Sequence, residues 1–396
     1  MSCIKEAVIV SAVRTPIGKI MGSLAALRPQ DLGGIAIKAA VEKAGIDPKL
    51  VDEVIMGQVV QAGMGQSPGR QAALLAGLPP TVNALTINKV CGSGLKAVML
   101  ATQAIRLSDA DFVVAGGMES MSMTPHAANL RNGVKYGHVQ FLDLMIYDGL
   151  TCPMGGMHMG ELGEYTAEKS GITREQQDWL AAESHRKAAE AWEKGYFADE
   201  VVPVEIPSRK GDPVVVDRDE GPRADTTVES LARLRPAFKK DGTITAANAP
   251  GLNDGAAAVV VTSEEKAKEL GLPILAYIRA YASNFVEPKE LFYAPIGAVR
   301  KVMEKLGTAD PNYFDLLEVN EAFAAQVLAD HKELQWDWAR YNVHGGSIAL
   351  GHPIGASGAR VLATLVHALK RYDRKTGLAS LCLGTGGAVA MAVERP

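Results

Sequence analysis

The chain has 396 residues, of which 47% are hydrophobic and 22% are charged, and its formal net charge is −4. This length is too great for one ordinary hydrophobic core, so it predicts a globular protein with at least two core-bearing units. The small net charge, the lack of runs of like charge and the shortness of the apolar stretches argue against nucleic acid or a membrane as a partner.

Segments typical of strands alternate with segments typical of helices over the first 118 residues. Runs of β-branched residues predict the strands, and apolar residues at three- and four-residue spacing predict the helices. The predicted strands are residues 7–13, 53–60, 82–90 and 111–115, and the predicted helices are residues 31–44, 67–76 and 92–107. This alternation predicts a layered α/β unit.

The stretch INKVCGSGLKAV at residues 87–98 places Cys91 between a predicted strand and a predicted helix. The free N–H groups and the dipole of a helix N-terminus favour negative charge, so they would lower the pKa of this thiol. Gly92 and Gly94 leave room for a substrate to approach. Alternatively, Cys91 is a small buried apolar side chain, as most free cysteines are. This stretch alone leaves both interpretations open.

The character of the sequence changes between residue 119 and about residue 250. Loops are predicted to dominate there, apart from one amphipathic helix at residues 174–194. Alternation then returns, with predicted strands at residues 256–262, 274–283, 314–319, 379–382 and 388–393 and predicted helices at residues 264–270, 297–306, 321–334 and 353–371. The central stretch is therefore predicted to be an insertion.

Two segments far apart in the chain resemble each other. GSGLKAVMLATQAI (92–105) followed by ADFVVAGG (110–117) has a counterpart in ASGARVLATLVHAL (356–369) followed by LASLCLGTGG (378–387). An internal duplication accounts for this repeat. We therefore expect an N-terminal α/β half at residues 1–118, an inserted loop domain at 119–250 whose last part returns to that half, and a C-terminal α/β half at 251–396.

Three further stretches carry residues capable of chemistry. His352 precedes Pro353, which suits the first position of a helix, and a helix N-terminus would keep the imidazole a neutral base; a turn histidine is the alternative. Cys382 ends a predicted strand and precedes Gly384, whose N–H could donate to an oxyanion; a buried cysteine beside a glycine-rich turn is the alternative. For Asn320 the default interpretation is a helix N-cap.

The N-terminus and the cysteines indicate the compartment. The chain enters a strand at once, without a signal peptide or an arginine-rich transit segment. The four cysteines, at positions 3, 91, 152 and 382, form no C-x-x-C pair and no disulfide-like framework. A reducing, cytoplasmic location is therefore predicted.

Eight short motifs occur in the order NKVCGSG, GGMES, HMG (158–160), LRPAF, GLNDGAA, NEAF, GHPIGASG and a final C-x-G. Together they resemble the thiolase family, in particular its acetyl-CoA acetyltransferase group, over essentially the whole chain. The resemblance implies an α/β fold of two duplicated halves in five layers, with an inserted loop domain. It also implies a homotetramer, a dimer of dimers, because residues 122–137 resemble the loop through which tetrameric members associate.

The resemblance implies a role for each candidate residue. Cys91 would accept the acetyl group as a thioester. His352 would activate Cys91 and, with a water held by Asn320, would line one oxyanion hole. Cys382 would take the α-proton from a second acetyl-CoA. The N–H groups of Cys91 and Gly384 would form a second oxyanion hole for the carbonyl of the acyl-enzyme.

Coenzyme A thioesters are the substrates that the resemblance implies, with no metal or redox cofactor. Arg223 matches an arginine beside the adenine and phosphates, although a solvated surface charge is the alternative. A plain core role is the alternative for Met159. Pro250 stands where many members have serine, so a hydrogen bond to the pantetheine arm is lost or moved. The expected substrate contacts are Arg223, Ser230, Pro250, Gly251, His158, Met159 and Phe323.

The expected activity is the reversible Claisen condensation of two acetyl-CoA to acetoacetyl-CoA and CoA, through an acetyl-cysteine intermediate. The main alternative is a 3-ketoacyl-CoA thiolase of β-oxidation that accepts longer chains, because residues 291–295 are LFYAP where the family often has Met-Gly-x-Gly-Pro. Phe292 and Tyr293 are both expected to reshape the acyl end of the pocket. A β-ketoacyl synthase is disfavoured because that group uses two histidines where this chain offers Cys382. A catalytically inactive binding protein is the remaining alternative.

Overall fold

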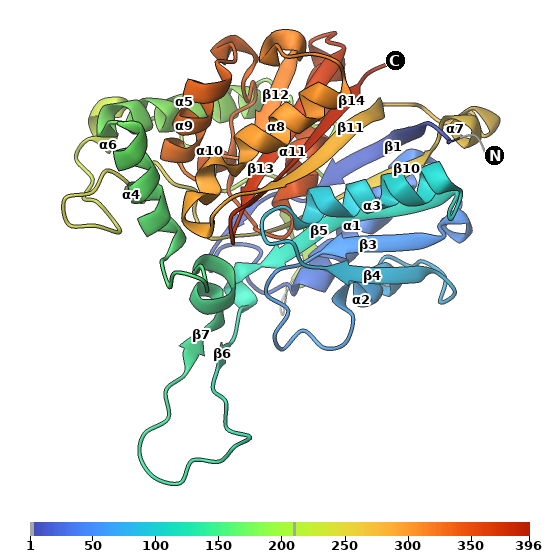
Figure 1. The fold of residues 1–396 in the computed structure, drawn as a ribbon. Coiled ribbons are helices and arrows are strands. Elements are labelled where there is room, and N and C mark those ends of the chain that lie inside the picture. Colours follow the sequence, from blue (N-terminus) through green and yellow to red (C-terminus); the bar gives the residue numbers. More distant parts are fainter. Residues whose placement is uncertain (1–3, 209–210) are drawn as a thin grey trace.

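A computed structural model describes residues 4–208 and 211–396, and its framework is one ten-stranded sheet (Figure 1). The strands follow the order β12-β13-β14-β11-β1-β10-β5-β3-β4, with β2 paired to β10. Their bounds are β1 Ala7–Arg14, β2 Gly18–Lys19, β3 Glu53–Gly57, β4 Asn83–Ile87, β5 Phe112–Ser120, β10 Asn253–Ser263, β11 Ala276–Phe285, β12 Leu316–Val319, β13 Thr376–Leu383 and β14 Gly387–Glu394.

The helices lie on both faces of this sheet and over its C-terminal half. Their bounds are α1 Pro29–Ala44, α2 Pro68–Leu75, α3 Ser93–Leu107, α4 Met159–Ser170, α5 Arg174–Glu193, α6 Val228–Leu231, α7 Glu264–Glu269, α8 Ala294–Lys305, α9 Ala324–Leu334, α10 Ser347–Leu350 and α11 Ser357–Arg371. Most predicted elements are confirmed, with ends that shift by a few residues. Two short two-stranded ribbons follow β5 and precede β10 along the chain. They are β6 His126–Ala127 with β7 Leu142–Asp143, and β8 Val204–Ile206 with β9 Val214–Val216.

The predicted duplication is visible in the strand pairing. In the first half β3 runs parallel to β5, β5 antiparallel to β10, and β10 antiparallel to β1. In the second half β12 runs parallel to β13, β13 antiparallel to β14, and β14 antiparallel to β11. The two sets meet where β1 pairs with β11. The chain therefore builds the same four-stranded unit twice.

Five layers follow from the alternation of buried side chains along these strands. Ile9 of β1 faces a central cluster that also contains α3 and α11, whereas Val8 packs on the opposite side against α1 and α2. On β14, Met391 faces the same central cluster, whereas Ala390 packs against α8 and α9. Because strand residues point alternately to the two faces, each half-sheet is covered by helices on both sides.

The two central helices approach each other so closely that only glycine fits at the contact. A Cβ atom at Gly358 of α11 would lie 2.3 Å from the Leu95 nitrogen, and one at Gly94 of α3 would lie 2.6 Å from the Ala359 nitrogen. Real side chains do not tolerate such distances, so the backbones of the two helix starts are in direct contact. The loops that precede α3 and α11 are thereby brought together.

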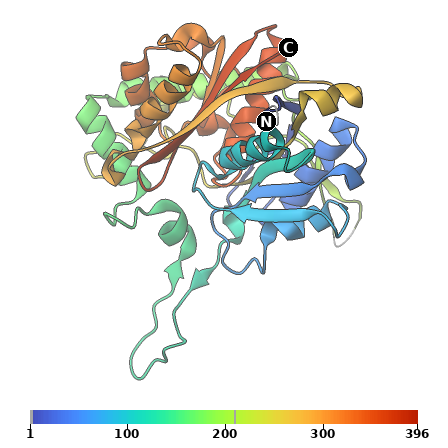
Figure 2. The ribbon, with the colours of Figure 1, turned by 45° about the vertical axis from the view of Figure 1, so that its right-hand side comes forward.

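The inserted region holds more helix than the sequence predicted. Helix α4 was expected to be loop, since Gly160 and Gly163 lower its helix propensity. The structure shows why glycine is tolerated: Phe238 lies over Gly160 and Ile244 over Gly163, closer than a Cβ would allow. The segment between β6 and β7 extends away from the body, as Figures 1 and 2 both show.

Gly358→Ala tests the contact between the central helices. We expect it to lower the free energy of unfolding by about 2–3 kcal/mol, because its Cβ would collide with backbone rather than with a movable side chain. Urea unfolding followed by circular dichroism measures this loss. Gly155→Ala is the matched control: no described atom lies within 4 Å of its Cβ, so we expect a change below about 0.5 kcal/mol. Equal effects for the two variants would contradict the account.

Candidate active site

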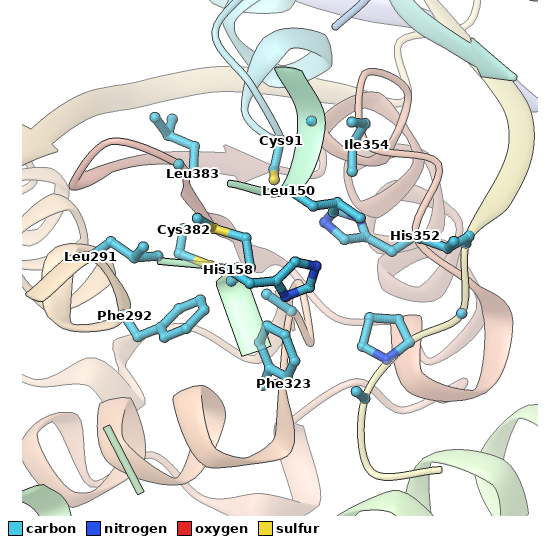
Figure 3. A pocket seen from close by; sticks show the side chains of 18 of the residues that line it. Cys91, Leu150, His158, Leu291, Phe292, Phe323, His352, Ile354, Cys382 and Leu383 are labelled. Carbon is cyan, nitrogen blue, oxygen red and sulfur yellow. The ribbon is translucent and has the colours of Figure 1, made fainter. Parts of the chain in front are cut away.

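One pocket collects residues from both halves of the duplication (Figure 3). In Figure 3 the sulfur atoms of Cys91 and Cys382 and the imidazole of His352 point into the same cavity. Cys91 precedes α3, His352 precedes α11 and Cys382 lies near the end of β13. The predicted site residues that line the pocket are Cys91, His158, Met159, Pro250, Gly251, Phe323, His352, Cys382 and Gly384.

The turn that carries Cys91 has a strained backbone. Val90 has a φ of 47°, a left-handed value that β-branched residues rarely adopt. The Ser93 hydroxyl donates to the Val90 carbonyl at 2.6 Å and accepts from the Lys89 N–H at 2.8 Å. These bonds hold the strained turn, which places Cys91 at the pocket just before α3 begins.

The expected lowering of the Cys91 pKa is wrong. Burial raises the pKa of this thiol to about 12, and the nearby Glu119 carboxyl adds to the increase. Hydrogen bonds from the N–H groups of Gly384 and of Cys91 itself act in the opposite direction but do not prevail. Desolvation of the thiolate therefore outweighs the helix N-terminus. Cys91 is a neutral thiol in the free protein and needs a base to become a nucleophile.

His352 lies in a loop rather than directly before a helix. The helix predicted to start at Pro353 begins only at Ser357. The intervening turn is held by Glu119 of β5, whose carboxylate accepts from the Gly355 N–H at 2.9 Å. The backbone N–H of His352 donates to Asn253 Oδ1 at 2.8 Å. The loop is therefore fixed from β5 and β10.

The hydrogen bonds around His352 define its tautomer. Ser357 Oγ lies 2.6 Å from His352 Nδ1 and donates its own hydrogen to the Pro353 carbonyl at 2.9 Å. With the Ser357 hydrogen assigned to the Pro353 carbonyl, Nδ1 carries the imidazole hydrogen and Nε2 keeps a free lone pair. Burial lowers the pKa of His352 to about 3, and the positive charge of Arg360 contributes. The imidazole is therefore neutral, as expected, although burial rather than a helix N-terminus is the main cause, and its role as a base stays a prediction.

The predicted capping role of Asn320 is wrong. Helix α9 has Phe323 as its N-cap residue, and Asn320 is fully buried in the connection after β12. Its Oδ1 accepts from the Ser347 hydroxyl at 2.6 Å, and its Nδ2 lies 3.5 Å from His352 Nε2. The side chain is engaged in tertiary contacts, which sequence periodicity cannot indicate. The structure thus brings Asn320 to His352 at the edge of the pocket.

Cys382 and Gly384 face Cys91 from the second half. Cys382 is 1% exposed, and burial raises its pKa well above the ordinary value, with Cys91 and Asp330 as further causes. Gly384 lies in the turn between β13 and β14 and donates its N–H to the Cys91 sulfur. Two thiols, one imidazole and a backbone donor therefore share one small volume.

Aromatic side chains form a wall of the pocket next to Cys382. The ring of Phe323 lies 5.4 Å from that of Phe292 and 6.2 Å from that of Phe238. His158 stacks on Phe238 at 5.1 Å, and its Nδ1 accepts from the Gly160 N–H as the N-cap of α4. Phe292 lines the pocket as expected, but Tyr293 does not: its hydroxyl lies 2.6 Å from Ser170 Oγ. The prediction for Tyr293 is therefore wrong.

Arg223 and Ser230 lie outside the pocket lining, on the exposed surface of the inserted region. The Arg223 N–H donates to His185 Nδ1 at 3.2 Å. Ser230 belongs to α6 and exchanges hydrogen bonds with Thr227 at its N-terminus. Their contacts with coenzyme A stay predictions.

Several lining residues were not among the predicted site residues. Phe238 and Leu291 belong to the LRPAF and LFYAP stretches, so these motifs indicated that the two residues lie near the site. Met121, Leu150 and Ile354 had no sequence signal, because their positions depend on how the loops fold over the site. They make most of the lining apolar, which suits a short acyl group.

Two further features concern the residues that the structure describes, 4–208 and 211–396. No helix there is long and apolar enough to cross a membrane. No group of three or more histidine, cysteine, aspartate or glutamate residues is arranged there to hold a metal ion.

Comparison with known proteins agrees with the geometry. Residues 7–265 match the N-terminal domain of thiolase, and residues 272–395 match its C-terminal domain. A protein of Pseudomonas aeruginosa named acetyl-CoA acetyltransferase is 54% identical over 392 residues, covering 99% of this chain and 100% of that protein. One of the same name from Cupriavidus necator is 55% identical over 391 residues, covering 98% and 99%.

A solved structure shares the whole fold. The crystal structure of the Bacillus anthracis acetyl-CoA acetyltransferase superposes with a TM-score of 0.97 at 45% identity, and each chain covers 100% of the other. The predicted fold of two duplicated α/β halves is confirmed. The chain belongs to the thiolase family.

Proposed function

We propose that this protein is an acyltransferase that converts two acetyl-CoA into acetoacetyl-CoA and CoA, reversibly, through an acetyl group carried by Cys91. The observation that supports this most directly is the meeting of Cys91, His352 and Cys382 in one pocket, with the Gly384 N–H on the Cys91 sulfur. The names of the related proteins support the same activity. The reaction uses thioester substrates and side-chain chemistry, with no metal or redox cofactor.

The first half-reaction transfers acetyl to Cys91. Nε2 of His352 takes the thiol proton, and the sulfur attacks the thioester carbonyl of acetyl-CoA. The N–H groups of Cys91 and Gly384 hold the oxygen as it becomes negative. The departing CoA thiolate takes the proton of Cys382, which is a thiol in the free protein because burial raises its pKa. Cys382 is thereby left as a thiolate.

The second half-reaction forms the carbon–carbon bond. The Cys382 thiolate removes an α-proton from a second acetyl-CoA, and the enolate oxygen is held by His352 and by a water bound to Asn320. The enolate carbon attacks the acetyl carbonyl on Cys91. The Cys91 sulfur leaves and takes its proton back from His352. Cys91, His352 and Cys382 then return to their starting states.

The walls favour a short acyl chain. Leu291, Phe292 and Phe323 are at most 8% exposed and close the end of the pocket beyond Cys382. A longer chain would have to displace this packed cluster. A 3-ketoacyl-CoA thiolase of broader chain length stays the second candidate, because the LFYAP stretch departs from the usual family pattern.

Assembly, location and domain division are further parts of the proposal. We propose a homotetramer, since the segment between β6 and β7 carries exposed apolar side chains such as Tyr136 and Phe141, at 100% and 62% exposure. The strand β4 is a sheet edge that a second copy can cover.

We also propose a cytoplasmic protein, for which the free thiols of Cys91, Cys152 and Cys382 are suited. We propose an inserted domain within residues 119–250 between the two α/β halves; because β10 pairs with β5 and β1, this strand belongs to the N-terminal half and not to a C-terminal half that begins at residue 251.

The first test is thiolysis of 3-ketoacyl-CoA esters from four to sixteen carbons at fixed CoA. We expect kcat/KM to be highest for the four-carbon ester and to fall steeply with length, because the pocket end is closed. Cys91→Ser should lose at least about a thousandfold in kcat, since the nucleophile is removed. Activity that persists to long chains would favour the second candidate. Activity that survives in Cys91→Ser would exclude the proposed mechanism.

Phe292→Ala tests the chain-length limit. Opening the end of the pocket should raise kcat/KM for the eight-carbon ester relative to the four-carbon ester by about tenfold or more. Tyr293→Phe is the matched control, because its hydroxyl bonds Ser170 outside the pocket, and its ratio should stay unchanged. If both variants shift the ratio equally, Phe292 does not set the limit.

A further inference from the structure

A chain of hydrogen bonds reaches Asn320 from the interior of the second half. Arg360 of α11 is 2% exposed, and its Nη2 donates to Ser347 Oγ at 2.7 Å. Ser347 in turn donates to Asn320 Oδ1 at 2.6 Å. Because a guanidinium has donors and no acceptor, Ser347 must accept from Arg360 and keeps its own hydrogen for Asn320. The direction of the chain is therefore fixed at its inner end.

The contact between Asn320 and His352, at the other end of this hydrogen-bond chain, requires the same orientation of the Asn320 amide. With Oδ1 facing Ser347, the Asn320 amide nitrogen faces His352 Nε2 at 3.5 Å. That nitrogen has a lone pair, since Nδ1 carries the hydrogen that faces Ser357. A flipped amide would set two acceptors against each other. The orientation of Asn320 is thus determined from both sides.

Stability alone is a poor reason for Arg360. Among the described residues its Nε and Nη1 make no hydrogen bond, and Nη1 lies 3.6 Å from a Glu318 carboxylate oxygen. A buried ion pair of this kind often contributes nothing to stability relative to apolar side chains of the same size. Among the described residues, the one hydrogen bond of the Arg360 side chain goes to Ser347, which holds Asn320. A costly buried guanidinium that uses its hydrogen bond in this way is typical of a positioning role.

We propose that Arg360 and Ser347 are positioning residues that hold the Asn320 amide in the orientation needed at the carbon–carbon bond step. This inference rests on the proposed function, in which Asn320 binds the water of the enolate oxyanion hole. Neither residue touches the substrate. Removing either link frees the amide to turn, which loosens one oxyanion donor and leaves the Cys91 and Gly384 donors in place.

Ser347→Ala gives the sharpest test, because it removes the link and leaves the Arg360 charge. We expect kcat for acetoacetyl-CoA thiolysis to fall by about ten- to a hundredfold, with KM changed less than about threefold. Exchange of labelled CoA into acetyl-CoA, which needs Cys91 acetylation but no carbon–carbon cleavage, should change by less than about threefold. Arg360→Met should show the same selective loss.

Thr364→Val is the matched control. It removes a buried hydroxyl from α11, one turn after Arg360, that donates to Glu200 at 3.1 Å and takes no part in the Asn320 chain. Its thiolysis and exchange rates should both stay within about twofold of the unaltered protein. Urea unfolding of both variants shows whether their stabilities are comparable.

A double-mutant cycle separates positioning from a general structural effect. In an Asn320→Ala background, Ser347→Ala should cause little further loss of thiolysis, because its effect passes through Asn320. An equal loss in both backgrounds, an equal loss of thiolysis and exchange, or no loss at all would each overturn the inference. If the unaltered protein neither exchanges CoA nor cleaves acetoacetyl-CoA, the proposed function fails, and the inference fails with it.

Discussion

The contact between the starts of α3 and α11 is the constraint on which the site depends. Each helix brings a glycine, Gly94 or Gly358, to a point where any Cβ would strike the backbone of the other helix. Each helix is also preceded by a loop that carries one reactive side chain, Cys91 or His352. The duplication therefore does more than build two sheets. It places two equivalent loops, with different chemistry, against each other.

Burial then sets the chemistry of the groups that meet there. The Cys91 thiol, the Cys382 thiol and the His352 imidazole are all held in their neutral forms, because the pocket is apolar and desolvation penalises every charge. In the proposed mechanism, charge is created only during the reaction, when a proton moves between groups that are already neighbours. Fixed donors such as the Gly384 N–H would then stabilise the negative oxygen without reorganisation.

Much of the fold and part of the site could be predicted from the sequence. Apolar periodicity predicted most strands and helices, and the repeat around Ser-Gly predicted the duplication that the strand pairing shows. Cys91, His352 and Cys382 were found because reactive residues beside glycines are visible in a chain. Helix α4 was missed because its glycines are explained only by the side chains packed over them.

Tertiary contacts decided the points on which sequence reasoning failed. The pKa of Cys91 depends on burial, which outweighs the helix N-terminus that the sequence indicates. The start of α11 depends on Glu119, which holds Gly355 in a turn from a distant strand. The Asn320 amide is oriented by Ser347 and by a histidine that lies 32 positions away.

Peptide mass spectrometry of the protein after brief incubation with acetyl-CoA tests most directly whether Cys91 carries the acetyl group. We expect one acetyl group on Cys91, removed again by free CoA; an unmodified Cys91, or an acetyl group that CoA does not remove, would contradict the proposed mechanism.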